Sequence, residues 1–107
     1  MTFDAKIAVS DGVATIHLVG ELDARSAPRF NDLIIDAAQH ELNELVLIAD
    51  RLSYMSSAGL RCLVFAHQKM PRTVRIVLLG VQPEVAETIR LTGFDRSIVL
   101  QEAGELS

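Results

Sequence analysis

Apolar and polar side chains alternate at the start of the chain. From Phe3 to Ser10 the odd positions are apolar and the even positions mostly polar, and a period of two predicts a strand with one buried face. Asp11-Gly12 is typical of a tight turn, and Val13–Val19 is a second apolar run rich in β-branched residues. Residues 3–19 are therefore predicted to form a β-hairpin.

The period then changes to that of a helix. From Ser26 onward the apolar residues fall at helical spacing, and Pro28 suits the first turn, where its missing N–H needs no partner. Gly93 is expected to end the last helix in a left-handed conformation. The predicted helices run from Ser26 to Ala38, from the double serine Ser56-Ser57 to just before Pro71, and from Pro83 to Leu91.

Three further strands are predicted at 45–49, 74–80 and 98–100. The first is apolar without alternation, which favours a strand covered by helices on both faces. The order is β-β-α-β-α-β-α-β, and the alternation after the hairpin predicts an α/β fold with a mixed, mainly parallel sheet. We expect a single domain over residues 1–107, with helices packed on the sheet and a frayed tail at 102–107.

Composition and charge narrow the range of possible functions. The chain has 107 residues, of which 50% are hydrophobic and 5% aromatic, and its formal net charge is -4. Such a chain lacks the basic surface that nucleic-acid binding requires. The single cysteine, Cys62, excludes an internal disulfide and a multi-cysteine zinc site. No signal peptide or membrane span is predicted, so a soluble, cytoplasmic protein is expected.

The segment YMSSAGLR, residues 54–61, contains the main candidate for chemistry. A serine before a helix commonly caps it by accepting a hydrogen bond from a free backbone N–H. The same position is exposed, and the small residues Ala58 and Gly59 leave the Ser57 hydroxyl open to a visiting protein. The bulky Tyr54, Met55 and Leu60 are expected to fix the loop to the core. Capping and modification are compatible roles.

Catalysis by this serine is not predicted. Met55 stands where a G-x-S-x-G nucleophile elbow has its first glycine. His17 is expected in mid-strand, His40 near the end of the first helix, and His67 toward the end of the second, far from Ser57. A serine without an adjacent base is a poor nucleophile. No two candidate metal ligands share a tight helical or hairpin spacing, and no glycine-rich phosphate-binding motif is present. No metal and no cofactor is therefore expected.

A second polar segment, Gly20-Glu21-Leu22-Asp23, follows the second strand. A carboxylate near a helix start is favoured by the helix dipole, which alone explains Asp23 or Glu21. In a parallel sheet, however, this segment and the double serine leave the same edge. Asp23 and Ser57 are therefore expected to lie on one composite surface.

Together the two segments resemble a known family. GELDARSAPRF (residues 20–30) and YMSSAGLRCLVFA (residues 54–66), in this order of elements, resemble the STAS domain, the module shared by bacterial anti-sigma factor antagonists and the cytoplasmic tails of sulfate transporters. The resemblance covers essentially the whole chain. A free-standing chain of this length looks like the antagonist branch.

The resemblance implies site residues. The family's phosphorylated serine falls on Ser57, and its turn aspartate falls on Asp23. Many members have an aspartate immediately before the serine, whereas this chain has Ser56, which is the alternative site of modification. The expected partner-binding surface comprises Glu21, Asp23, Ser56, Ser57, Ala58, Gly59 and Arg61.

The resemblance also implies a function in transcription regulation. The unphosphorylated protein is expected to dock on an anti-sigma factor that is also a serine kinase, which releases a sigma factor. The kinase then phosphorylates the serine with its own ATP and so ends the docking, and a phosphatase resets the cycle. The chain is then a substrate, not an enzyme. The alternative is a STAS scaffold in a stress-signalling complex, or a module that controls a transporter or another kinase, with or without a small ligand.

Overall fold

The predicted hairpin opens a sheet in which the strands lie in the same order as in the sequence. The computed structural model describes residues 3–103, and within them five strands form one sheet of order β1-β2-β3-β4-β5. The elements are β1 (Phe3–Ser10), β2 (Val13–Leu22), α1 (Ala27–Ala38), β3 (Glu44–Met55), α2 (Ser57–Lys69), β4 (Arg75–Val81), α3 (Pro83–Leu91), the 3₁₀-helix η1 (Phe94–Arg96) and β5 (Val99–Glu102).

Strand pairing confirms the predicted class. β1 pairs with β2 antiparallel, whereas β2–β3, β3–β4 and β4–β5 are parallel pairs. The order β-β-α-β-α-β-α-β and the mixed, mainly parallel sheet are thus those expected from the sequence. The short η1 was not predicted. Gly93, just before it, has the left-handed conformation expected after the third helix, with φ of 76°.

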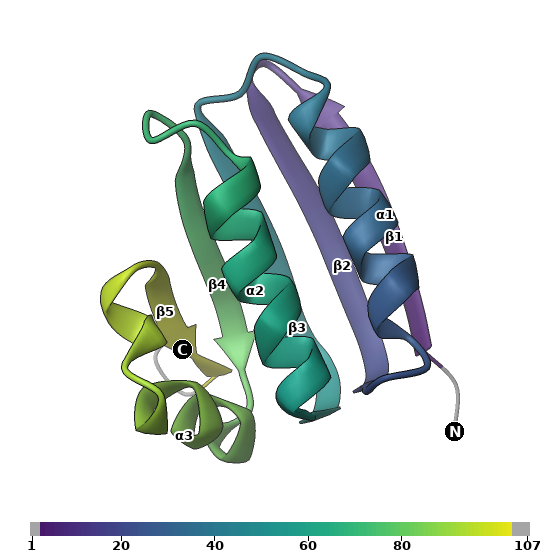
Figure 1. Ribbon diagram of the computed structural model, residues 1–107, viewed down its shortest axis with the longest axis vertical. Helices are drawn as coiled ribbons and strands as arrows, with labels where there is room; N and C mark the ends of the chain where they lie inside the picture. The colour runs from purple at the N-terminus through teal and green to yellow at the C-terminus, as the bar shows by residue number, and fades with distance from the viewer. Residues whose placement is uncertain (1–2, 104–107) are drawn as a thin grey trace.

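The helices share one core on one face of the sheet. Figure 1 shows α1 and α2 side by side in front of the sheet. The buried residues of α3 belong to the same core cluster as those of α1 and α2. Right-handed crossovers explain this arrangement, because strands added always in the same direction along the sheet bring every crossover helix to the same side.

The expectation that helices cover both faces of the third strand is therefore wrong. Leu45, Leu47 and Ala49 are completely buried in the core, whereas Val46 and Ile48 on the opposite face are only half-buried. Val46 and Ile48 satisfy the preference of a pleated strand for β-branched residues, and this preference hides the alternation in the sequence.

Three strands run further than predicted. β2 continues from the expected Val19 to Leu22, so Gly20, Glu21 and Leu22 belong to the sheet and only Asp23 of this polar segment follows the strand. β3 continues from the expected 45–49 to Met55. Its pairing with β2 contains a bulge between Ile48, which pairs with His17, and Arg51, which pairs with Val19. β5 reaches Glu102, where the frayed tail was expected to begin, and the Glu102 carboxylate pairs with Arg90 at 2.6 Å. The last residues of that tail, 104–107, lie outside the described residues.

Candidate functional site

The two polar segments meet where β2 and β3 end. Leu22 at the end of β2 pairs with Met55 at the end of β3. One residue further, the Ser56 N–H donates a 2.9 Å hydrogen bond to the Leu22 carbonyl. The pairing places the chain that leaves Leu22 beside the chain that enters α2. The predicted composite edge, with Asp23 on one segment and Ser57 on the other, is therefore present.

The two serines have different roles. Ser56 is the N-cap of α2, and its Oγ accepts a 3.2 Å hydrogen bond from the Ala58 N–H. Ser57 is the first residue of the helix, and its side chain is exposed. Its hydroxyl has no hydrogen-bond partner among residues 3–103. Capping therefore falls to Ser56, and the Ser57 hydroxyl is left available.

Asp23 organises the loop before α1. Its Oδ1 accepts hydrogen bonds from the N–H groups of Arg25 (3.0 Å) and Ser26 (3.2 Å) and from the Ser26 hydroxyl (3.2 Å), while the Asp23 N–H donates to Ser26 Oγ at 2.9 Å. The backbone hydrogen bond from Ser26 is the main cause that lowers the pKa of Asp23 below its ordinary value. Asp23 is thus an ionised structural anchor, with one carboxylate oxygen left for other contacts.

Of the two small residues after Ser57, one faces the core. Gly59 is buried, and a Cβ built on it would lie 2.7 Å from Met55 Cγ and 3.0 Å from Leu22 Cγ. Its missing side chain therefore lets α2 start close against the ends of β2 and β3. Ala58 is half-buried. The partner surface expected at Gly59 is corrected to this packing role.

Arg61 is exposed one turn after Ser57, and its side chain makes no hydrogen bond or ion pair with the part of the chain from 3 to 103. Tyr54, expected to anchor the loop, is instead 50% exposed, whereas Met55 is buried as expected. The exposed ring adds an apolar element to the edge that the sequence interpretation missed.

A cavity of about 530 Å³ opens beside the Asp23 loop. Its described lining consists of Phe3, Glu21, Asp23, Arg25, Ser26 and Arg29. Arg25 and Arg29 were not expected at this edge. Arg29 is held there because its guanidinium donates a 3.1 Å hydrogen bond to the Ala5 carbonyl of β1. The periodicity of α1 could have indicated Arg29 as a residue of its solvent-facing side, but not this contact.

The histidine of α2 lies far from Ser57. His67 lies near the other end of α2, and its ring packs edge-on against Phe94 with the ring centroids 6.0 Å apart. Within residues 3–103 no three His, Cys, Asp or Glu side chains gather in a way that could hold a metal ion. The helices of the same residues are too short or too polar to span a bilayer.

These features define an α/β domain that presents an exposed serine and a structured acidic turn on one edge. Comparison with known families is more specific. The STAS domain model matches residues 4–105, and the chain belongs to the STAS domain family. No curated protein matches the sequence.

Solved structures with this fold include anti-sigma factor antagonists. The antagonist from Mycobacterium paratuberculosis is 24% identical, with a TM-score of 0.82 over 94% of this chain and 86% of that chain. The Bacillus cell fate determinant SpoIIAA in its phosphorylated form is 21% identical, with a TM-score of 0.71 over 98% and 96%. A sulfate transporter family protein from Wolinella succinogenes is 17% identical, with a TM-score of 0.74 over 89% and 80%. At these levels of sequence identity, the similarity shows a shared fold.

Proposed function

We propose that this protein is a cytoplasmic anti-sigma factor antagonist whose docking is controlled by phosphorylation of Ser57. The observation that carries the proposal is the exposed Ser57 hydroxyl, which has no partner among residues 3–103 because Ser56 supplies the helix cap. Two structures of the same fold support it, an anti-sigma factor antagonist and SpoIIAA in its phosphorylated form.

The cycle has two states. The unphosphorylated protein binds an anti-sigma factor that is also a serine kinase. The kinase transfers the γ-phosphoryl group of ATP to Ser57 Oγ, with loss of the hydroxyl proton and release of ADP, and the complex dissociates. A phosphatase hydrolyses the phosphoserine and restores the binding form. The protein is a substrate and a binding partner in this cycle.

The contact surface in this proposal is the edge where β2 and β3 end. It comprises Glu21, Asp23, Ser56, Ser57, Ala58 and Arg61. Gly59 contributes indirectly, because its close packing on Met55 and Leu22 fixes the position of the first turn of α2. The free Arg61 guanidinium and the remaining oxygen of Asp23 offer charges of opposite sign to a partner.

Phosphorylation would leave the fold intact and act on the partner. A phosphoserine carries about −1.5 to −2 charge at neutral pH. A charge of this sign is favoured at a helix N-terminus, and the first turn of α2 has no acidic residue to oppose it. On the partner side, a dianion about 6 Å from one carboxylate costs about 5 kcal/mol at an effective dielectric constant near 20, before salt screening. A fraction of this energy is enough to dissociate a micromolar complex.

The first test is to purify the protein from its native host and to map phosphate by mass spectrometry. We expect phosphate on Ser57 in the wild type and in Ser56→Ala, and none in the 54–61 peptide of Ser57→Ala. Phosphate found only in other peptides, or on Ser56 and not Ser57 in the wild type, would contradict the assignment.

The second test measures affinity for the kinase that co-purifies with the Ser57→Ala protein. Ser57→Ala should bind as tightly as the unphosphorylated wild type, and Ser57→Glu at least tenfold more weakly. Gln68→Glu is the matched control, because Gln68 is also an exposed residue of α2 whose side chain makes no hydrogen bond within the described residues, but it lies near the other end of the helix. Equal weakening by both glutamates would show that added charge acts without regard to position.

The sulfate transporter family protein of the same fold favours a second candidate, a STAS module that controls a transporter or belongs to a stress-signalling complex. Chemical cross-linking in native cells distinguishes the two candidates. A membrane transporter or a scaffold joined to the 54–61 peptide would support the second candidate, whereas an anti-sigma kinase there supports the first.

A further inference from the structure

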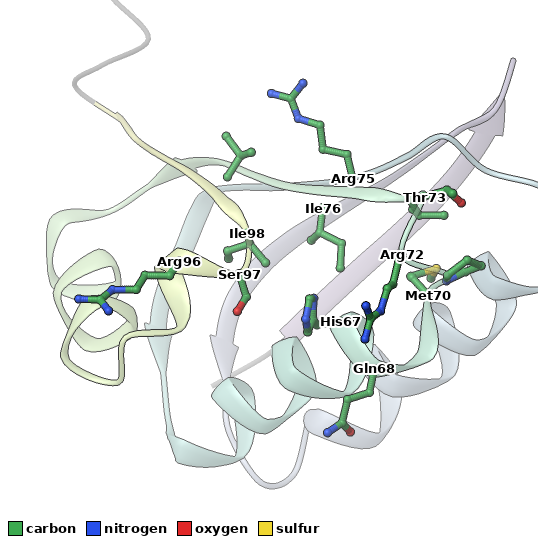
Figure 2. Close-up of a pocket in the computed structure, with 13 residues that line it drawn as sticks. His67, Gln68, Met70, Arg72, Thr73, Arg75, Ile76, Arg96, Ser97 and Ile98 are labelled. Atoms are coloured by element: carbon green, nitrogen blue, oxygen red, sulfur yellow. The ribbon is translucent and has the colours of Figure 1, made fainter.

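A second cavity lies at the end of the domain opposite Ser57. It has a volume of about 870 Å³ and is bordered by the end of α2, the turn before β4, and the segment between η1 and β5 (Figure 2). His67 at its border lies about 15 Å further along the α2 axis than Ser57. Because it lies at the amino ends of β4 and β5, it is here called the amino-end cavity. It shares no lining residue with the proposed partner surface.

The lining of this cavity is basic although the protein is acidic. Arg72, Arg75 and Arg96 line it together with His67, and none of the described lining residues is an aspartate or glutamate. The chain as a whole has a formal net charge of -4. A cavity with one sign of charge concentrates ligands of the opposite sign.

These arginines are poorly neutralised by the protein itself. The side chains of Arg72 and Arg96 make no hydrogen bond or ion pair with any residue from 3 to 103. The Arg75 side chain has one loose contact within the described residues, in which its Nε lies 3.8 Å from Glu44 Oε2. Figure 2 shows the Arg72 side chain beside His67 and Gln68, whereas Arg75 and Arg96 extend outward from the rim. Arg72 is therefore the cation best placed to meet a bound ligand.

Apart from the Gln68 amide, the rest of the lining is apolar with two hydroxyl groups. Met70, Ile76 and Ile98 are buried, and Figure 2 shows Ile76 and Ile98 close to His67 and Ser97. The hydroxyls of Thr73 and Ser97 make no hydrogen bond within the described chain. Small-molecule sites typically combine such an apolar lining with a few polar groups that orient the ligand.

We propose that the amino-end cavity binds a small organic anion, with its phosphate or carboxylate on Arg72 and its apolar part on Ile76 and Ile98. A guanidinium suits both acid groups, because it offers two parallel N–H donors to their oxygens. The Ser97 and Thr73 hydroxyls supply further donors. This inference does not depend on the proposed role of Ser57.

The test is an NMR titration of the ¹⁵N-labelled protein at low salt with four probes: phenyl phosphate, benzoate, inorganic phosphate and benzyl alcohol. We expect saturable shifts centred on the amides of Arg72, Thr73 and Ser97, with a Kd of about 1 mM or tighter for phenyl phosphate or benzoate. The better of these two probes identifies the preferred acid group. Inorganic phosphate and benzyl alcohol should bind at least tenfold more weakly, because each lacks one half of the ligand.

Arg72→Gln should weaken the better probe at least tenfold. Arg51→Gln is the matched control, because Arg51 is also exposed and has no ion pair within the described residues, but it lies outside the cavity. Equal effects of the two variants, shifts centred elsewhere, or no saturable shift with any probe would overturn the proposal. None of these results bears on phosphorylation of Ser57, which is measured separately.

Discussion

The Ser56 N–H and the Leu22 carbonyl are joined by a 2.9 Å hydrogen bond. This bond links the residue that caps α2 to the last residue of β2, and so ties the serine segment to the Asp23 turn. The first turn of α2 is thereby fixed on a rigid base. A group added to Ser57 changes a surface whose backbone is already held in place, which suits a binding surface that is to be switched by one modification.

Ser56 caps α2 and Ser57 does not, so substitution of each serine should have a different effect on stability. Ser56→Ala removes the side chain that accepts from the Ala58 N–H, and loss of such a cap costs about 1 kcal/mol. Ser57→Ala removes an exposed hydroxyl without a partner in the described residues and should change the free energy of unfolding by less than about 0.5 kcal/mol. Urea denaturation followed by circular dichroism measures both. A larger loss for Ser57→Ala would mean that Ser57 supplies the cap.

Gly59→Ala should destabilise the domain by about 1–3 kcal/mol, the usual cost of overpacking. The new Cβ would lie 2.7 Å from Met55 Cγ and 3.0 Å from Leu22 Cγ, so these buried side chains or the start of α2 must shift. The same urea titration measures the loss. In the double variant Gly59→Ala/Met55→Ala the clash with Met55 is removed, so the loss should be smaller than the sum of the two single losses. Additive losses would show that Met55 is not the residue in conflict.

The lowered pKa of Asp23 predicts a contribution to stability that depends on pH. The hydrogen bond from the Ser26 N–H favours the ionised carboxyl in the folded protein. For a pKa lowered on folding, the contribution is present above the ordinary carboxyl pKa and is lost as pH falls through the folded value. Titration of the Asp23 side-chain ¹³C resonance should therefore show a midpoint below the ordinary aspartate value.

Asp23→Asn is the control for this prediction. Asparagine keeps an oxygen that can accept from Arg25 and Ser26 but has no charge to titrate. The free energy of unfolding of the Asp23→Asn variant should therefore fall less steeply between pH 5 and pH 3 than that of the wild type. Urea titration at each pH measures both. Equal slopes in the two proteins would contradict the role given to the carboxylate.

Local patterns in the sequence predicted the fold and the edge, but not the contacts that decide which residue does what. Periodicity located the hairpin, the three helices and the two polar segments, because each depends on neighbouring residues. The assignment of the cap to Ser56 depends on backbone angles at the α2 start, and the burial of Gly59 depends on Leu22, 37 positions away in the chain. The half-buried face of β3 was missed because Val46 and Ile48 are as apolar as their buried neighbours.

This face of β3 gives a direct test of where the core lies. Leu47→Ala should cost about 2–5 kcal/mol, because Leu47 is fully buried under the helices. Ile48→Ala should cost clearly less, since Ile48 is half-buried on the side away from them. Chemical denaturation of the two variants compares adjacent residues of the same strand. Similar losses would indicate that a further segment or a second chain covers the Ile48 face in solution.

The one cysteine predicts slow chemical labelling of the native protein. Cys62 is buried, its Sγ lies 3.6 Å from the Ala27 carbonyl, and burial raises its pKa to about 11. Since the thiolate is the reactive species, this pKa alone reduces its population at pH 8 by roughly two orders of magnitude relative to an ordinary cysteine. Iodoacetamide at pH 8 should therefore label Cys62 slowly in buffer and rapidly in concentrated urea, as measured by intact-mass spectrometry. Because Cys62 packs between α1 and α2, fast labelling without urea would show that these two helices separate readily in the folded protein.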